Sequence, residues 1–220
     1  MSQSKEIITY IDRLGSEAKQ ASMILSQTPL DQKNEALKQI SEEIQLNRKE
    51  ILKVNQSDLA LAKEKSIGSA LIDRLELNDT RIDSMISGLE VVSELPDPVG
   101  EITHLDPTPS GIKVSKMRVP LGVVGIIYES RPNVTADAAA LCLKSGNACL
   151  LRGGSEAIQS NKFIWNCLQN GLIKAGLPKE CIQLIETIDR EAVKTLLHLD
   201  EYLDVIIPRG GKGLVKLIAE

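Results

Sequence analysis

Aromatic side chains and net positive charge are both scarce in this sequence. Phe, Trp and Tyr make up 2% of the 220 residues, and the formal net charge is −4. Nucleic-acid-binding domains typically combine a basic patch with aromatic rings on which bases stack. Because neither feature is visible, we expect no nucleic-acid partner.

The sequence also lacks a long apolar run. A membrane-spanning helix needs roughly 20 consecutive apolar residues, and no such segment exists. Residues 1–19 are amphipathic and carry acidic side chains, so they do not have the apolar core of a signal peptide. We therefore expect a cytoplasmic protein with no membrane partner.

Metal-binding side chains are few. Only His104 and His198 offer an imidazole, and no two cysteines form a C-x-x-C pair, so the sequence predicts no metal site. The four cysteines are Cys142, Cys149, Cys167 and Cys181. A reducing compartment disfavours disulfides, and we interpret these thiols as small apolar core residues of predicted helices and strands.

The first 99 residues have the apolar spacing of helices. One face is marked by residues three and four apart, namely Ile7, Ile11, Leu14, Ala18, Ala21 and Leu25. Thr28 is predicted to cap a second helix, with Pro29 in its first position, and residues 47–50 resemble a capping box that starts a third. We predict a helical segment, residues 1–99, that packs on a second domain, residues 100–220.

The pattern changes after Gly100. Residues 111–129 alternate and then become continuously apolar, which predicts a hairpin-like pair followed by a buried strand at residues 123–128. Further helices are predicted at residues 133–144, 155–175 and 189–198, and further strands at 148–151, 181–185 and 205–207. This alternation predicts an α/β fold with a parallel sheet. Another helix begins at Gly213, and because open α/β sheets rarely finish there, we expect the chain to be part of a longer protein.

Ligands of parallel sheets bind beyond the carboxyl ends of the strands. The first candidate loop, residues 128–135, follows the predicted buried strand at such an end. It places charged, amide and hydroxyl side chains in one turn. We interpret Arg131 and Asn133 as candidates for binding substrate or stabilising an oxyanion. The alternative is an ordinary helix start, capped by Ser130 or Asn133.

The second candidate loop follows the strand predicted at residues 148–151. It reads Arg152-Gly153-Gly154-Ser155-Glu156. The two glycines let a backbone approach a ligand closely, the following helix start favours an anion, and Arg152 could bind a phosphate through two hydrogen bonds. The alternative is a tight turn with a surface arginine.

The third candidate loop follows the strand predicted at residues 205–207. It reads Arg209-Gly210-Gly211-Lys212-Gly213, and its glycines and cations suit a phosphate or a nucleotide. This turn matches neither of the common nucleotide-binding motifs, and a glycine-rich turn alone is a weak signal of nucleotide binding. Three similar turns at the same edge of one sheet make a stronger case.

Four motifs carry a family resemblance. YESRPNVT, SGNA-x-x-LRGG and IPRGGKG occur in this order, and DRLELND lies in the helical N-terminal segment. With these motifs the chain resembles the γ-glutamyl phosphate reductase family (glutamate-5-semialdehyde dehydrogenases) of the aldehyde dehydrogenase superfamily. The resemblance covers the whole chain, but only about the first half of a typical family member. It implies a Rossmann-like cofactor domain without the catalytic domain that follows it in the family.

The resemblance implies an NADPH-dependent oxidoreductase of proline biosynthesis. Family members reduce L-glutamate 5-phosphate to L-glutamate 5-semialdehyde and release phosphate. A cysteine thiolate attacks the acyl phosphate, forming a thioester that NADPH reduces. The family's nucleophile lies well after the IPRGGKG segment and matches none of the four cysteines here, so we expect the isolated chain to be inactive. The resemblance also allows a homo-oligomer and a functional contact with glutamate 5-kinase.

The resemblance also suggests roles for the three loops. Arg152 to Glu156 correspond to the segment that holds the adenosine ribose, where Arg152 could meet the 2′-phosphate of NADP. Arg209 to Gly213 correspond to the segment near the pyrophosphate. Asn133 lies near the superfamily's oxyanion-stabilising asparagine, and Arg131 is an equal candidate.

Two other functions fit parts of the sequence. A catalytically incomplete chain could serve as a nucleotide-binding or assembly module. An ATP-dependent kinase could use the RGGKG turn for phosphates, although no Ser or Thr follows Lys212 to bind Mg²⁺.

Overall fold

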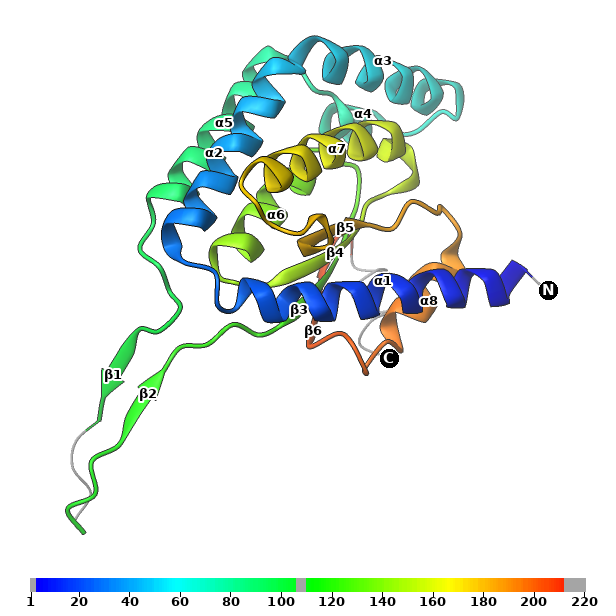
Figure 1. Cartoon of the computed structure of the whole chain (residues 1–220). Coiled ribbons are helices and arrows are strands. Elements are labelled where there is room, and N and C mark those ends of the chain that lie inside the picture. The colour runs from blue at the N-terminus through cyan, green and yellow to red at the C-terminus, as the bar shows by residue number, and fades with distance from the viewer. Residues whose placement is uncertain (1–2, 106–109, 212–220) are drawn as a thin grey trace.

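Helices make up most of the N-terminal half of the chain. The computed structural model describes residues 3–105 and 110–211 (Figure 1). The helices of this half are α1 (Gln3–Leu25), α2 (Leu30–Leu46), α3 (Arg48–Glu64), α4 (Ser69–Leu75) and α5 (Asp79–Glu94). The predicted helical character of this segment is therefore confirmed.

Two predicted helix caps are wrong, although both helices begin close to the expected residues. Thr28 donates its hydroxyl to the carbonyl oxygen of Ile24 at 2.9 Å, and Pro29 occupies the N-cap position of α2. Asn47 donates its side-chain amide to the carbonyl oxygen of Glu43 at 2.8 Å and does not cap α3. In both cases the polar side chain binds a carbonyl oxygen in the last turn of the preceding helix and is not available to cap the next one.

Asn78 does cap a helix. Its side-chain oxygen accepts a hydrogen bond from the backbone N–H of Arg81 at 2.9 Å, in the first turn of α5. We expect Asn78→Ala to lower the free energy of unfolding by about 1 kcal/mol, because the cap oxygen is lost. Urea denaturation measures the change. Asn78→Ser keeps a capping oxygen and should lose less, and equal losses in both variants would contradict the role of the cap.

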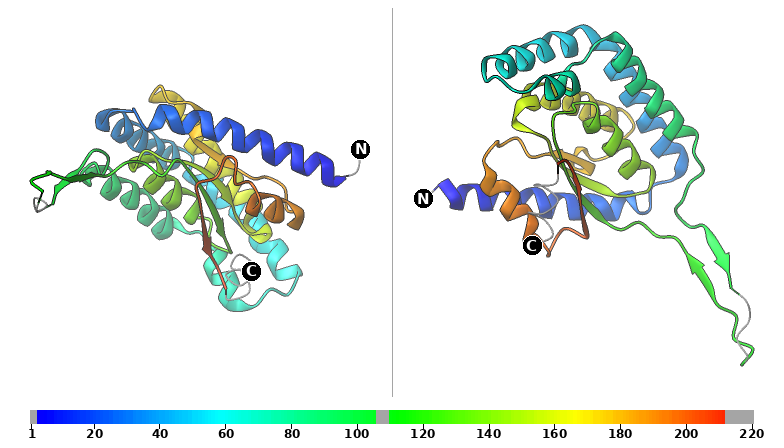
Figure 2. Two further views of the ribbon diagram at one scale, coloured as in Figure 1. Left: turned by 90° about the horizontal axis from the view of Figure 1, so that it is seen from below. Right: turned by 180° about the vertical axis from the view of Figure 1, so that it is seen from behind.

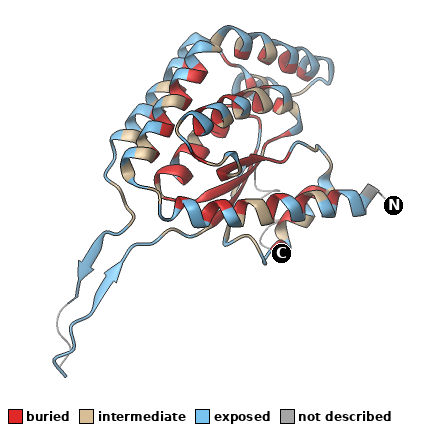
Figure 3. Cartoon of the chain, in the orientation of Figure 1, coloured by how far each residue is buried: buried red, intermediate tan, exposed pale blue. Residues whose placement is uncertain are grey.

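A two-stranded hairpin projects from the rest of the molecule. β1 (Ile102–His104) pairs antiparallel with β2 (Ser115–Met117), and Figure 1 shows the pair extending away from the helices. The residues of both strands are exposed (pale blue in Figure 3). The predicted hairpin-like pair is confirmed, although its first strand lies before the alternating segment at residues 111–129.

Strands and helices alternate after Gly122, as predicted. The strands are β3 (Val123–Tyr128), β4 (Ala148–Arg152), β5 (Ile182–Leu184) and β6 (Val205–Arg209), and the helices are α6 (Val134–Lys144), α7 (Ile158–Lys174) and α8 (Arg190–Leu197). Short 3₁₀ turns, η1 (Ser155–Ala157) and η2 (Lys179–Cys181), precede α7 and β5. The helix expected from Gly213 onward lies outside the described residues.

The strand order places a reversal at the centre of the sheet. The four strands are parallel and lie in the order β5-β4-β3-β6. From β3 to β5 the chain adds strands in one direction, and after α8 it returns to the opposite side of β3. Counted along the chain, this is the 3-2-1-4 order of a Rossmann-type half, and the reversal forms a switch point between β3 and β6.

Helices cover both faces of the sheet. α1 crosses one face and packs beside α8, whereas α6 and α7 lie on the other face (Figures 1 and 2). α2 and α5 form an outer layer, in which α2 packs along α7. The contact between α2 and α7 is close because Gly171 has no side chain. A Cβ atom there would lie 2.5 Å from Cγ1 of Ile40.

Residues from both ends of the chain share one hydrophobic core. Figure 3 shows the buried faces of the helices turned toward the buried sheet. Ile11, Ile40 and Ile82 of the N-terminal helices join Leu150 and Ile164 in one cluster, and all five are fully buried. This packing connects residues 1–99 closely to residues 100–220, and a division into two domains at this point stays a prediction.

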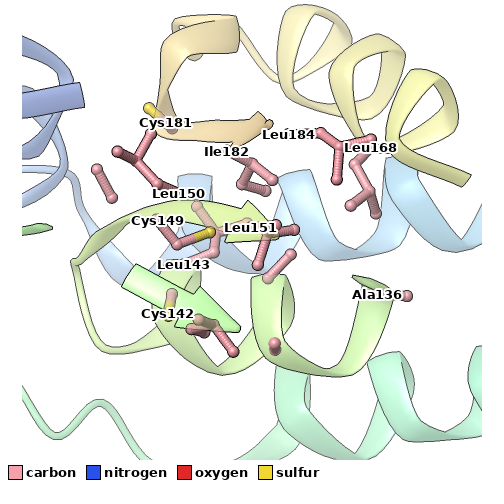
Figure 4. Packing of buried hydrophobic residues seen from close by; sticks show 14 of the residues in the cluster. Ala136, Cys142, Leu143, Cys149, Leu150, Leu151, Leu168, Cys181, Ile182 and Leu184 are labelled. Atoms are coloured by element: carbon pink, nitrogen blue, oxygen red, sulfur yellow. The ribbon is translucent and has the colours of Figure 1, made fainter. Parts of the chain in front are cut away.

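All four cysteines are free and buried. Figure 4 shows Cys142, Cys149 and Cys181 among leucine and isoleucine side chains. Burial raises the pKa of Cys167 and of Cys181 to about 12, so both thiols are protonated at neutral pH. Their interpretation as core residues is confirmed, with one correction: Cys181 lies in η2, directly before β5, and not in a strand.

Candidate functional site

Three strands of the sheet end beside one another. Tyr128 of β3 lies opposite Arg209 of β6, and Ile127 of β3 lies opposite Arg152 of β4. Because the strands are parallel, the loops that follow them leave the sheet at the same edge. The expectation that the three candidate loops are neighbours is therefore confirmed.

A cavity lies at the switch point between β3 and β6. Its volume is about 410 Å³, and we call it the switch-point cavity. It is lined by Arg74, Tyr128, Glu129, Arg131, Val134, Arg209, Gly210 and Gly211. Open α/β sheets bind their ligands in the crevice at such a point, so the first and third candidate loops meet where a nucleotide is expected.

Two carboxylates tie the three loops together. Oε2 of Glu129 accepts a hydrogen bond from the backbone N–H of Gly211 at 2.8 Å, which joins the first loop to the third. Oε1 of Glu156 accepts from the backbone N–H and the hydroxyl of Ser130, at 2.7 and 2.5 Å, which joins the first loop to the second. Ser130 has a φ angle of 43°, a left-handed conformation that is uncommon for serine. The two hydrogen bonds to Glu156 hold it there.

The first loop does lead into α6, with Asn133 at the N-cap position, but the predicted side-chain capping by Ser130 or Asn133 is wrong. Ser130 is committed to Glu156, and Nδ2 of Asn133 donates to Oδ2 of Asp137 at 2.8 Å. Asn133 makes no side-chain capping bond to α6. The side chains of Ser130 and Asn133 therefore bind other side chains and not the backbone N–H groups of α6.

Arg152 is oriented by backbone carbonyl groups. Nη1 donates to the carbonyl oxygen of Gly153 at 2.7 Å, and Nη2 donates to that of Ile188 at 3.3 Å. Its Nε is buried and has no partner within the part of the chain that the structure describes. Burial lowers the pKa of Arg152, and the nearby charge of Arg190 acts in the same direction. This half-buried guanidinium is thus held at the sheet edge with one donor unpaired.

The glycines of the second loop are required by side-chain packing. A Cβ atom on Gly153 would lie 2.1 Å from Nδ2 of Asn161, and one on Gly154 would lie 2.1 Å from Oε1 of Glu156. The space that was expected to admit a ligand at these glycines is therefore filled by Asn161 and Glu156. Gly211 differs, because the nearest atom to its Cβ position is Oε2 of Glu129 at 3.8 Å. Among the described residues, a Cβ atom on Gly211 would therefore make only an ordinary van der Waals contact.

Asn133 lines a second cavity, which we call the arginine cavity. Its volume is about 380 Å³, and it is lined by Asp73, Arg74, Arg81, Ser84, Met85, Arg131, Asn133 and Asp137. Arg74 and Arg131 also line the switch-point cavity, so the two cavities adjoin. Burial raises the pKa of Asp137, while the hydrogen bond from Asn133 and the charge of Arg209 lower it.

The structure therefore separates the predicted site residues into two groups. Arg131, Asn133, Arg209, Gly210 and Gly211 line the two adjoining cavities. The second loop lies beside them at the end of β4, with Ser155 exposed at the start of η1. Lys212 and Gly213 fall outside the described residues.

Among the lining residues that were not predicted as site residues, three bear on the arrangement of the site, namely Arg74, Glu129 and Asp137. Glu129 lies within the first candidate loop, residues 128–135, whereas the only signal for Arg74 was the family resemblance carried by the DRLELND motif. Asp137 gave no signal of its own, because an acidic residue in the first turn of a helix is adequately explained by the helix dipole.

The described residues show neither a metal cluster nor a membrane span. Within residues 3–105 and 110–211, no group of three His, Cys, Asp or Glu side chains could hold a metal ion. None of the helices in the same ranges is long and apolar enough to cross a membrane.

The fold and its central crevice define an α/β protein with a parallel, Rossmann-type sheet. More particularly, the chain belongs to the aldehyde dehydrogenase family, whose family model matches residues 8–220. This is a family of oxidoreductases that use a nicotinamide cofactor.

Solved structures of two γ-glutamyl phosphate reductases are similar to this chain. The protein from Thermotoga maritima is 42% identical, with a TM-score of 0.90 over 95% of this chain and 50% of its own. The protein from Saccharomyces cerevisiae is 32% identical, with a TM-score of 0.86 over 99% of this chain and 54% of its own. A probable aldehyde dehydrogenase from Listeria monocytogenes, 18% identical with a TM-score of 0.76, shares the fold. The chain thus spans about half the length of the two reductases.

Proposed function

We propose that the chain forms the NADPH-binding half of a γ-glutamyl phosphate reductase. The whole protein would reduce L-glutamate 5-phosphate to L-glutamate 5-semialdehyde and release inorganic phosphate. The observation that carries the proposal is the switch-point cavity, which Arg131, Arg209 and Gly211 line together. The likeness to two reductases over nearly the whole chain supports the choice of reaction.

The residues present fit a dinucleotide phosphate. Arg209, Gly210 and Gly211 would hold the pyrophosphate, because a cation and a backbone without side chains favour close approach of an anion. Arg152 would hold the 2′-phosphate, and its unpaired buried Nε supports this assignment. Arg190 lies close enough to affect the pKa of Arg152, so a second cation is available to the same phosphate. In this assignment Glu156 acts mainly by fixing the first loop through Ser130.

Arg131 and Asn133 would stabilise negative charge on the carbonyl oxygen of the substrate. Asn133 donates one amide hydrogen to Asp137 and has a second N–H to offer. Donors that are already oriented act on developing charge without reorganisation. When bound, NADPH supplies the reducing equivalents. All four cysteines are buried, and we assign none of them as the nucleophile.

We also propose that the whole protein is a homo-oligomer. The β1–β2 hairpin exposes apolar side chains along its length, with Ile102 53%, Ile112 61% and Met117 59% exposed. A projecting segment of this kind is typical of an interface between subunits. A cytoplasmic location and a functional contact with glutamate 5-kinase are proposed from the resemblance to the reductase family alone.

The cofactor assignment predicts different effects for two arginines. Arg152→Ala should weaken NADPH binding about tenfold or more and leave NADH binding nearly unchanged, because hydrogen bonds to a charged phosphate contribute about 1.5–3 kcal/mol. Arg209→Ala and Gly211→Val should weaken both cofactors alike. Fluorescence titration of each variant measures these affinities, with Arg13→Ala, on the exposed surface of α1, as the control. Equal losses of NADPH and NADH in Arg152→Ala would exclude the 2′-phosphate role.

A further inference from the structure

The arginine cavity has an unusual mixture of charges. Three arginines and two aspartates line it, from α4 and α5 on one side and from the loop after β3 and the start of α6 on the other. A cavity for a simple anion needs only cations. A cavity with both signs suits a ligand that carries both signs, such as an amino acid.

Arg81 and Asp73 form an ion pair with each other. Nη2 of Arg81 donates to Oδ1 of Asp73 at 2.9 Å, and Nη1 donates to the carbonyl oxygen of Glu76 at 2.7 Å and to that of Asp73. These bonds satisfy carbonyl groups at the C-terminus of α4. Arg81 therefore fixes the position of α4 and is not free to bind a ligand.

Arg74 and Arg131 differ from Arg81, because they make no such contacts with the described residues. Both side chains are exposed, and neither guanidinium makes an ion pair or a hydrogen bond with any residue in the described ranges. They come from elements far apart in the sequence, and each lines both cavities. Two unpaired guanidinium groups at the junction are suited to carboxylate and phosphate groups, which they bind through pairs of hydrogen bonds.

Asp137 supplies the opposite charge. Its Oδ2 accepts the hydrogen bond from Asn133, which leaves Oδ1 without a hydrogen-bond partner among the described residues. Asp137 lines the arginine cavity, and its Oδ1 faces Gly88 of α5, where a Cβ atom would make an ordinary van der Waals contact at 3.8 Å. A half-buried carboxylate oxygen in this position can accept hydrogen bonds from an ammonium group.

We propose that the arginine cavity binds the amino-acid end of the substrate. Arg74 binds the α-carboxylate, Asp137 binds the α-ammonium group, and the acyl phosphate extends toward Arg131, at the junction of the two cavities. The inference rests on the proposed function, and it adds Arg74 and Asp137 as residues that determine specificity. A site built for hydrogen-bonding groups strongly rejects ligands that lack them, because its own polar groups would be left unpaired.

The test is calorimetric titration of the chain with L-2-amino-6-phosphonohexanoate. This stable compound has the same number of atoms between its α-carbon and its phosphorus as L-glutamate 5-phosphate. Arg74→Gln should weaken binding about tenfold or more, in line with the loss of charged hydrogen bonds. Arg13→Gln is the matched control and should bind as the wild type does. Thermal unfolding followed by circular dichroism checks that each variant is folded.

A second ligand separates the role of Asp137 from that of Arg74. The analogue 6-phosphonohexanoate lacks the amino group. Asp137→Asn should weaken binding of the amino acid but not of this analogue, whereas Arg74→Gln should weaken both. A folded Asp137→Asn variant that loses both ligands equally would contradict the ammonium assignment.

Titration of the same proteins with NADPH distinguishes failure of this inference from failure of the proposed function. If the wild-type chain binds NADPH, two results would overturn the inference and leave the cofactor assignment standing. In the first, Arg74→Gln binds the phosphonate as tightly as the wild type. In the second, neither the wild type nor Arg74→Gln binds the phosphonate. A folded chain that binds neither NADPH nor the phosphonate would overturn both.

Discussion

Gly171→Ala should destabilise the chain by about 3 kcal/mol, because a methyl group would be forced into the backbone of a neighbouring helix. The new Cβ atom would lie 2.6 Å from the backbone nitrogen of Ile40, 2.8 Å from its Cα and 2.5 Å from its Cγ1. A flexible side chain could turn away, but α2 can yield only by separating from α7. Urea denaturation measures the loss as a lower midpoint with an unchanged slope.

Gly88→Ala is the matched control for this substitution. Gly88 also lies inside a helix, α5, but the nearest atom to its Cβ position is Oδ1 of Asp137 at 3.8 Å. Alanine should therefore stabilise the chain by about 0.5–1 kcal/mol, because it lowers the entropy of the unfolded state and favours helix. Effects of equal sign and size at both glycines would contradict the close packing of α2 on α7.

Asn55→Ala should lower the free energy of unfolding by roughly 2–4 kcal/mol, because buried groups would lose their hydrogen-bond partners. Asn55 is fully buried. Its amide donates to the carbonyl oxygen of Leu75 at 2.9 Å and to the hydroxyl of Ser160 at 3.0 Å, and its oxygen accepts from the N–H of Leu77 at 2.7 Å. These bonds join α3 and α7 to the C-terminus of α4, which carries Arg74.

The same variant should also weaken binding of the amino-acid phosphonate, since the end of α4 would be less firmly held. Asn166→Ala, at an exposed position of α7, is the control and should change neither stability nor binding by much. Thermal unfolding and calorimetry measure the two effects. A loss of stability with unchanged binding would show that Arg74 is positioned without help from Asn55.

The sheet could be predicted from the sequence because its signals are local. Residues 123–128 form a continuous apolar run, and all six are buried in β3. Helices of ordinary length separate this strand from the ones that follow, which predicts parallel pairing and places the three loops at one edge. The bounds of β4 and β6 differ from the prediction by at most two residues.

The details of the site could not be predicted, because they depend on contacts between distant residues. Nothing local to Glu156 indicates that it binds Ser130, and nothing local to Gly153 indicates that Asn161 fills the space beside it. Arg74 lies 57 positions before Arg131 in the sequence, yet both line the same two cavities. The predicted cap at Thr28 was wrong for a local reason, because its hydroxyl binds the carbonyl oxygen of Ile24, four residues earlier in α1.

The most direct test of this account is a fluorescence titration of the folded chain with NADPH and, separately, with NADH. The account predicts saturable binding of both, with NADPH bound more tightly because Arg152 would meet its 2′-phosphate. Saturable binding with that preference would support the assignment of the loops after β3, β4 and β6 as a cofactor site. A chain that is folded by circular dichroism and binds neither nucleotide would contradict the account.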